Sequence, residues 1–317
     1  MGTQGVESSN GVASSSVSSA DAAASDRHGT GVAAPITNFV RPTTLPKYFG
    51  VDVDGTFLAE DPAVHERNLE AFARAVRTGV NIFFCTGRAP DDAMRSLPEE
   101  LCEEIGFTGY PGVYYNGGAV FGRGGKILKQ ELFRKDILKR IADRIVQANH
   151  QRYTMFLTLE KWYVVSDDWS CFDELIAELD LGSKFTPSTI EQVMDMDIMK
   201  VIVLRYAQVA HLFEDMADVD FVAKCALNDM TDLNPLGITK GSGLALVLAH
   251  LGGTPEECGY VGDAINDVEA MRLARHSFAV GNAKDSVKAC AKYVVQATNE
   301  EGAFRVVMDA VYGGDYS

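Results

Sequence analysis

The chain has 317 residues, 46% of them hydrophobic, so it can bury a substantial core and is long enough for two domains. Its formal net charge of −15 argues against nucleic acid as the main partner, because nucleic-acid backbones are bound by clustered Lys and Arg. No stretch approaches the roughly 20 consecutive apolar residues of a membrane-spanning helix, so we expect no membrane partner either.

The cysteines and the amino terminus both favour a cytoplasmic location. Six cysteines lie far apart, at positions 85, 102, 171, 225, 258 and 290, without a CxxC pair, and several occur inside apolar runs, as reduced core thiols do. The amino terminus lacks the basic start and apolar run of a secretory signal. It also carries Glu7, Asp21 and Asp26, which count against an organelle transit peptide.

Residues 1–44 differ in composition from the rest of the chain. They are rich in Ser, Ala and Gly, contain almost no aromatic residues and follow neither a helical nor a strand period. Such a segment cannot bury enough apolar surface to offset the entropy lost on ordering. We therefore expect a disordered tail, with the folded unit beginning near Pro46.

Strands and helices alternate from Tyr48 onward, which predicts the first part of a core domain over residues 45–125. The expected elements are a strand from 48 to 53, a helix that ends at 79, strand 80–85, helix 91–97 and strand 113–115. A glycine-rich turn at 122–125 follows. Val51 and Val53 suit a buried parallel strand, in which both faces are covered by helices.

The pattern changes over residues 126–227, where two strands follow each other directly. The expected elements are helix 135–148, strands 153–159 and 162–165, helix 169–179, strand 198–204, helix 209–216 and strand 221–226. Adjacent strands in this order are typical of an antiparallel α+β unit. We therefore expect a second, inserted domain here.

The alternation resumes over residues 228–317, which predicts the second part of the core domain. The expected elements are helix 240–251, strand 259–262, helix 268–273, strand 278–280, helix 285–291, strand 293–295 and helix 302–311. The fold class expected is therefore α/β, with a Rossmann-like, doubly wound parallel sheet that is interrupted by an α+β domain.

Two carboxylates follow the first strand in the stretch Asp52-Val53-Asp54-Gly55-Thr56. Open α/β sheets bind ligands at the carboxyl ends of their strands, where Asp52 is expected. A carboxylate at a strand end, a second one two residues later and a glycine suit a nucleophile, a proton donor and a close backbone approach to an anion. The alternative is an acidic turn without chemistry.

Two further element ends suit a bound phosphate. A hydroxyl and backbone N–H groups at Thr86-Gly87 lie just before a helix start, and Lys240 lies in the first turn of a helix capped by Thr239. Lys240 would supply a point charge against the phosphate. Taken singly, Thr86 could simply end a strand and Lys240 could be a solvated lysine.

A third group, Asp263, Asn266 and Asp267, follows the strand that ends at Gly262. Hard oxygen ligands suit Mg²⁺, and Asp52, Asp263 and the main-chain carbonyl of Asp54 could hold it. The alternative is a turn followed by a helix cap. All of these groups occur at element ends in chain order, which favours a single site over unrelated turns.

The sequence from about Pro46 onward resembles the haloacid dehalogenase superfamily, and within it the Cof-like phosphatases with a large α/β cap. The resemblance rests on four motifs: Asp52-Val53-Asp54-Gly55-Thr56, Cys85-Thr86-Gly87-Arg88, Lys240-Gly241 and Gly262-Asp263-Ala264-Ile265-Asn266-Asp267. It implies that residues 126–227 are the cap. The long amino-terminal segment departs from the family pattern.

The resemblance also implies a role for each motif residue. Asp52 would be the nucleophile that forms an aspartyl-phosphate, and Asp54 the general acid and base. The expected phosphate- or substrate-binding residues are Thr86, Gly87, Arg88, Asn116, Lys240 and Asn266. The expected metal site consists of Asp52, Asp54, Asp263 and Asp267, with Mg²⁺ as the cofactor.

These expectations predict a Mg²⁺-dependent phosphomonoester hydrolase that acts on a small phosphorylated metabolite. One alternative is a phosphotransferase of the phosphomannomutase type, which shares the fold and cap and returns the phosphoryl group to a sugar. Another is a catalytically silent binding protein, although such proteins usually lose one of the aspartates. The sequence leaves the substrate and the oligomeric state open.

Overall fold

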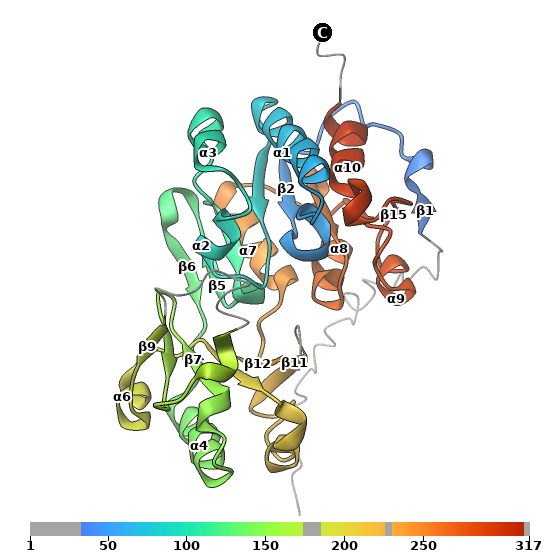
Figure 1. The fold of residues 1–317 in the computed structure, drawn as a ribbon. Coiled ribbons are helices and arrows are strands. Elements are labelled where there is room, and N and C mark those ends of the chain that lie inside the picture. Colours follow the sequence, from blue (N-terminus) through green and yellow to red (C-terminus); the bar gives the residue numbers. More distant parts are fainter. Residues whose placement is uncertain (1–32, 174–184, 226–229, 314–317) are drawn as a thin grey trace, which may run out of the picture. The chain divides into compact units, whose positions relative to one another are not determined.

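The computed structural model describes residues 33–173, 185–225 and 230–313 (Figure 1). Its central feature is a parallel sheet with the strand order β1-β15-β14-β13-β2-β3. The strands are β1 (Ala34–Pro35), β2 (Tyr48–Val51), β3 (Asn81–Phe84), β13 (Cys258–Gly262), β14 (His276–Ala279) and β15 (Tyr293–Val294). All four residues of β2 are buried, as a central strand covered on both faces requires.

Helices cover both faces of this sheet, so the doubly wound α/β core expected from the sequence is confirmed. One face packs against α1 (Pro62–Arg77) and α10 (Ala303–Tyr312), and the other against α7 (Lys240–Leu251) and α8 (Val268–Leu273). Successive side chains of a strand point to opposite faces of the sheet. Phe49 of β2 therefore packs in the hydrophobic cluster with α1 and α10, and Tyr48 packs in the cluster with α7 and α8. The short helices α2 (Pro90–Met94), α3 (Glu99–Ile105) and α9 (Asp285–Lys288) complete the core.

A small antiparallel sheet extends the core beyond β3. It contains β4 (Gly112–Tyr114), β5 (Ala119–Phe121) and β6 (Ile127–Gln130), and Val113 forms a parallel bridge with Cys85. We expected the inserted domain to begin at residue 126. That boundary is wrong for β6, because its pairing with β5 ties it to the core.

The inserted domain has its own sheet, with the strand order β11-β12-β10-β7-β8-β9. Its strands are β7 (Thr154–Leu157), β8 (Trp162–Val164), β9 (Phe185–Pro187), β10 (Lys200–Leu204), β11 (Phe221–Cys225) and β12 (Met230–Pro235), and its helices are α4 (Lys135–Gln147) and α6 (Ile190–Asp195). The pairs are antiparallel except β8 with β9, which confirms the α+β character.

Three expectations for the inserted domain need correction or fall outside the described residues. β12 pairs with β10 and β11, so this domain extends past the expected end at residue 227. The expected helix 209–216 is a 3₁₀ helix at Ala210–Phe213. Of the expected helix 169–179, the structure describes residues 169–173, which contain the 3₁₀ turn Ser170–Phe172.

The segment that precedes β2 packs on the core, so the expectation of a disordered tail up to residue 44 is wrong for residues 34–41. β1 pairs with β15, and the guanidinium of Arg41 donates hydrogen bonds to the carbonyls of Asp309 and Ala310 in α10. Phe39 lies against three rings of the sheet at centroid distances of 5.9, 5.3 and 5.1 Å: His276, Phe278 and Tyr293. Residues 1–32 lie outside the described part. Within that part, no helix is long and apolar enough to cross a membrane.

Phe39→Ala should lower the free energy of unfolding by about 2 kcal/mol, because it removes ring packing from a partly buried site. For a chain of this size, thermal denaturation should show a loss of roughly 3 to 4 °C. Val40→Ala is the matched control, since its side chain is 82% exposed and should leave the melting temperature unchanged. Equal melting temperatures for both variants would show that the segment adds nothing to the fold.

Candidate active site

The carboxyl ends of three neighbouring strands carry the expected site residues. Asp52 directly follows β2, Thr86 lies two residues after the end of β3, and Asp263 directly follows β13. β2 lies between the other two strands, and Val51 is in register with both Phe84 and Val261. The parallel sheet therefore gathers residues that are up to 211 positions apart in the chain at one edge, where such sheets bind ligands.

A buried ammonium group connects two of the carboxylates. Lys240 Nζ donates to Asp52 Oδ1 at 2.6 Å and to Asp267 Oδ1 at 2.7 Å, and its side chain is only 1% exposed. Burial by itself would lower the pKa of Lys240, but the charges of Asp267 and Asp52 outweigh it and raise this pKa. Lys240 is therefore a fixed cation beside the expected nucleophile.

The start of helix α7 positions Lys240. The Thr239 hydroxyl caps the helix by accepting a hydrogen bond from the backbone N–H of Ser242. The loop at Gly117 packs directly on this helix start, since a Cβ atom on Gly117 would lie 2.2 Å from the Thr239 carbonyl oxygen. With a φ of +97° as well, this position requires glycine.

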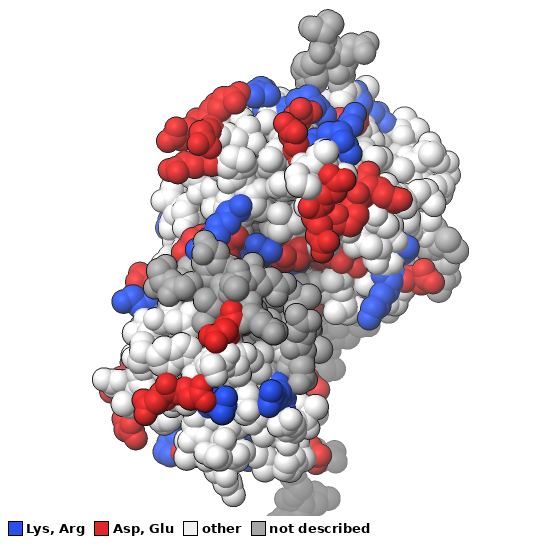
Figure 2. Space-filling view, in the orientation of Figure 1, with Lys and Arg blue, Asp and Glu red and all other residues white. Residues whose placement is uncertain are grey.

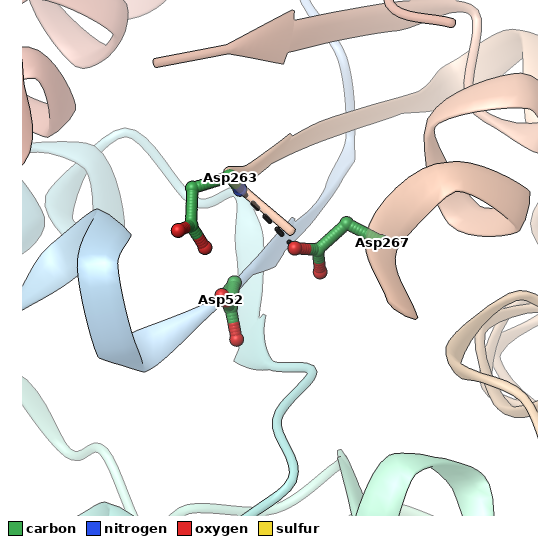
Figure 3. A group of neighbouring side chains, drawn as sticks. All are labelled: Asp52, Asp263 and Asp267. Carbon is green, nitrogen blue, oxygen red and sulfur yellow. Dashed lines mark hydrogen bonds between the residues drawn. The ribbon is translucent and has the colours of Figure 1, made fainter. Parts of the chain in front are cut away.

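Asp267 organises the neighbouring loop as well as Lys240. Its Oδ2 accepts a hydrogen bond from the backbone N–H of Asp263 at 3.1 Å (Figure 3). The same oxygen accepts from the backbone N–H of Ala264 at 2.9 Å, and Oδ1 accepts from the Tyr260 hydroxyl at 2.6 Å. Both carboxylate oxygens are thus engaged by donors of the chain itself. Asp52 and Asp263 are therefore better placed than Asp267 to bind a cation directly.

The charge of this group fits a bound metal ion. Asp52, Asp263 and Asp267 each bring an oxygen within 4.8 Å of the others, and among the described side chains the Lys240 ammonium bridges two of them, Asp52 and Asp267. Burial and then the charge of Asp267 raise the pKa of Asp263 to about 6, and the same two causes raise the pKa of Asp52 despite Lys240. A hard cation held by carboxylate oxygens would relieve this repulsion.

Asp54 lies outside this carboxylate group and pairs with Arg88. The guanidinium donates from Nε at 2.9 Å and from an Nη atom at 2.5 Å to the two oxygens of Asp54. The Asp54 side chain is 55% exposed, compared with 6% for Asp52. Arg88, expected to bind phosphate, thus contacts Asp54, and the side chain of Asp54 does not join the other carboxylates.

The remaining expected residues form a connected polar group. Asn266 donates to the side-chain oxygen of Asn116 at 2.9 Å, and the backbone N–H of Asn116 donates to the carbonyl of Thr86 at 2.9 Å. A Cβ atom on Gly87 would lie 3.2 Å from the Asn116 amide nitrogen, so these loops touch. The Thr86 hydroxyl accepts from the backbone N–H of Arg88, and its own hydrogen can donate to a ligand.

Asn282, which was not among the expected site residues, supports the carboxylate group from the loop that follows β14. Its amide donates to the carbonyl of Gly55 at 2.8 Å and lies 3.5 Å from Asp263 Oδ2, and its oxygen accepts from the backbone of Asn299. Gly55 has a φ of +67° and little space, because a Cβ atom there would lie 2.5 Å from Asp263. The signal was present in the sequence, since Asn282 lies two residues after the strand expected at 278–280.

Comparison with known proteins agrees with the geometry. The 5-amino-6-(5-phospho-D-ribitylamino)uracil phosphatase YwtE of Bacillus subtilis is 24% identical over 304 residues, which cover 86% of this chain and 100% of YwtE. The HMP-PP phosphatase of Klebsiella pneumoniae is 27% identical over 77% of this chain and 88% of its own. A chloroplastic protein of Arabidopsis thaliana, named endoribonuclease YBEY, is 28% identical over 84% of this chain, but the match spans only 46% of that protein.

Solved structures and the family match lead to the same assignment. A HAD/Cof-like hydrolase from Plasmodium vivax superposes with a TM-score of 0.74 at 25% identity, covering 84% of this chain and 96% of the other. The subclass IIB sugar phosphatase BT4131 shares the fold, with a TM-score of 0.67 at 19% identity over 83% of this chain and 98% of its own. Residues 49–307 match the haloacid dehalogenase-like hydrolase family. The chain therefore belongs to the haloacid dehalogenase-like hydrolases, as an α/β core that carries an inserted cap domain.

Proposed function

We propose that this protein is a Mg²⁺-dependent phosphatase that releases phosphate from a small phosphorylated metabolite through an aspartyl-phosphate. The observation that carries the proposal is the contact of Asp52, at the end of a central strand, with the buried ammonium of Lys240 at 2.6 Å. Two relatives that match most of this chain are named phosphatases of small phosphorylated compounds. Their names support the reaction class and leave this chain's own substrate open.

Asp52 is the nucleophile in this proposal. Lys240 occupies its Oδ1, so Oδ2, 3.5 Å from the Thr56 hydroxyl, attacks the phosphorus. The new bond joins Oδ2 to phosphorus while the bond to the leaving oxygen breaks, and water then hydrolyses the acyl phosphate. Dividing the reaction into two steps and neutralising charge with Lys240 both lower the barrier.

Asp52 and Asp263 hold the metal ion in this proposal, with the main-chain carbonyl of Asp54 as a third ligand. When bound, Mg²⁺ would neutralise negative charge on the transferring phosphoryl group. Asp267 acts on this site through its hydrogen bonds to Lys240 and to the Asp263 loop. The phosphate oxygens accept from Lys240 and from a group of polar residues on the neighbouring loops: Thr86, Gly87, Asn116 and Asn266.

Asp54 is the general acid and base in this proposal, and Arg88 is its partner rather than a phosphate ligand. The pairing keeps Asp54 away from Lys240 and the buried carboxylates, so two carboxylates only two residues apart meet different surroundings. To protonate a leaving oxygen, Asp54 must turn from Arg88 toward the substrate. Two neighbouring carboxylates can act as nucleophile and as acid only if their surroundings differ.

The surface supports a small ligand over a nucleic acid. On the face drawn in Figure 2, Lys and Arg are scattered among Asp and Glu and form no continuous basic stripe. The net charge of −15 points the same way. The cytoplasmic location stays a prediction from the sequence.

Asp52→Asn should abolish turnover, because a neutral amide of nearly equal shape cannot attack phosphorus. It should keep or raise the melting temperature without metal, since it removes one of three crowded carboxylates and leaves Lys240 paired with Asp267. Turnover is measured as phosphate release from p-nitrophenyl phosphate in the presence of Mg²⁺. The dependence on metal is measured with the wild-type enzyme in excess chelator. Turnover by the variant, or full wild-type activity in chelator, would contradict the proposal. Transfer to a sugar with a bisphosphate requirement would indicate a phosphotransferase instead.

Asp54→Asn should slow alkyl phosphates about 10² to 10⁴ times more than aryl phosphates in the phosphorylation step, because only an alkoxide needs a proton to leave. Burst kinetics should show that the aryl substrate still forms the aspartyl-phosphate quickly and then stalls at hydrolysis. Arg88→Lys, which keeps the charge but loses the bidentate pairing, is the companion variant. An equal loss of phosphorylation for both substrates would mean that Asp54 mainly shapes the metal loop.

Asn282→Ala should weaken Mg²⁺ binding by roughly 10- to 100-fold, as loss of a residue that orients metal ligands typically does. The Mg²⁺ concentration at which the melting temperature rises reports binding without turnover, and the Mg²⁺ dependence of activity should move in parallel. Asn81→Ala, at the opposite end of the sheet, is the matched control. Identical Mg²⁺ dependence in both variants would remove Asn282 from the metal site.

A further inference from the structure

Tyr260 lies in the middle of strand β13 and brings a neutral hydroxyl into the carboxylate group of the site. The hydroxyl donates to Asp267 Oδ1 at 2.6 Å, and the side chain is 0% exposed. The ring packs in the apolar cluster that contains residues of α7 and α8. A buried tyrosine hydroxyl normally has a hydrogen-bond partner, and here that partner is an acidic side chain of the site. Tyr260 therefore connects the apolar layer on one face of the sheet to the site.

Space for this ring comes from a glycine on the neighbouring strand. Gly50 of β2 is in register with Tyr260, and a Cβ atom on Gly50 would lie 2.8 Å from Tyr260 Cδ2. The backbone of Gly50 lies outside the left-handed region, so the close approach of the ring is what requires glycine here. Glycine in the interior of a strand weakens that strand. The chain thus loses packing in β2, two residues before Asp52, at the point where the Tyr260 ring passes over it.

The hydroxyl is one of four donors that the described residues give to the Asp267 carboxylate. Oδ1 accepts from Tyr260 and, at 2.7 Å, from Lys240 Nζ. Oδ2 accepts from the backbone N–H groups of Asp263 and Ala264. The terminal torsion of an Asp side chain has broad minima, so hydrogen bonds decide how the carboxylate is turned. With Tyr260 and Lys240 on one oxygen and the loop on the other, the Asp267 carboxylate is held in one orientation.

Lys240 lies between Asp267 and the expected nucleophile, Asp52. Its ammonium donates to Asp267 at 2.7 Å and to Asp52 at 2.6 Å. Burial lowers the pKa of Lys240, and the charge of Asp267 raises it, more than the charge of Asp52 does. Asp267 is thus the carboxylate that attracts Lys240 more strongly. The hydrogen bond from Tyr260 stabilises part of the negative charge on Asp267 Oδ1, which weakens the attraction of that oxygen for Lys240 and favours the contact of Lys240 with Asp52.

We propose that Tyr260 is a positioning residue for the phosphorylation of Asp52, because its hydroxyl holds Asp267 and so keeps the Lys240 ammonium beside the nucleophile. This inference rests on the phosphatase function proposed above and adds a residue that contacts neither the substrate nor the metal ion. Within the described part of the chain, two of the three N–H groups of Lys240 donate to carboxylates, which leaves one for a phosphoryl oxygen. Charge that develops on the phosphoryl group is stabilised best by a donor whose position is fixed beforehand.

Tyr260→Phe removes the hydroxyl and keeps the ring over Gly50, so the fold should be retained. Phosphorylation of Asp52 should slow by roughly 10-fold, as expected for the loss of one hydrogen bond to a charged group. The step is measured by rapid mixing, as p-nitrophenol release from p-nitrophenyl phosphate in a single turnover with Mg²⁺. Tyr312→Phe is the matched control, because Tyr312 is also buried and its hydroxyl donates to the carbonyl of Pro46 at 3.0 Å. The control should keep the wild-type rate, and equal rates for the two variants would overturn the proposal.

Two further readouts separate positioning from a structural role and from an effect on Asp54. The kcat/KM values of Tyr260→Phe for hexyl phosphate and p-nitrophenyl phosphate should fall by the same factor, because Lys240 acts on the phosphoryl group that both substrates share. A loss confined to hexyl phosphate would place the effect on the general acid Asp54 and would contradict the proposal. A lower melting temperature with unchanged rates, as a purely structural hydroxyl predicts, would contradict it too. If wild-type enzyme released phosphate from neither substrate, the phosphatase function would be wrong, and this inference with it.

Discussion

The buried ammonium of Lys240 is the interaction on which the site depends. Without it, Asp52, Asp263 and Asp267 would bring three carboxylates together with little solvent, and at least one would take up a proton. Its hydrogen bonds to Asp52, at the end of β2, and to Asp267, in the turn before α8, also fix the start of α7 against the edge of the sheet. One positive charge against three carboxylates leaves the group negatively charged, so the group could bind a divalent cation.

Around this cation, the loops are held by contacts that need particular small residues. Gly55 and Gly117 both have positive φ values, and each lies where a Cβ atom would collide with a residue of the site. Asn282 and Asp267 then fix the loop backbones through their side chains. The carboxylates are thus preorganised before any ligand binds, as electrostatic stabilisation of a transition state requires.

The core and the cap differ in the polar groups that they present near the site. The core supplies concentrated charge, which suits the phosphoryl group common to all phosphate esters. The cap face near Tyr115 carries Lys200, whose ammonium lies over the Tyr115 ring and donates a hydrogen bond to Asp232. Tyr115 connects the two, because its hydroxyl donates to the Thr158 carbonyl of the cap while its backbone N–H donates to the Arg88 carbonyl of the core.

The sequence by itself determined the parallel α/β core and the gathering of Asp52, Thr86 and Asp263, because each follows an apolar strand and strands of such a sheet share one carboxyl edge. It also identified Lys240 from a helix cap. Only the tertiary structure decided that Arg88 pairs with Asp54, that β12 belongs to the cap sheet and that Phe39 packs on the core. The physical reason is that local periodicity reports which face of an element is buried. The partner of an exposed charge, of a polar strand such as β12 or of an isolated ring is fixed by residues distant in the chain.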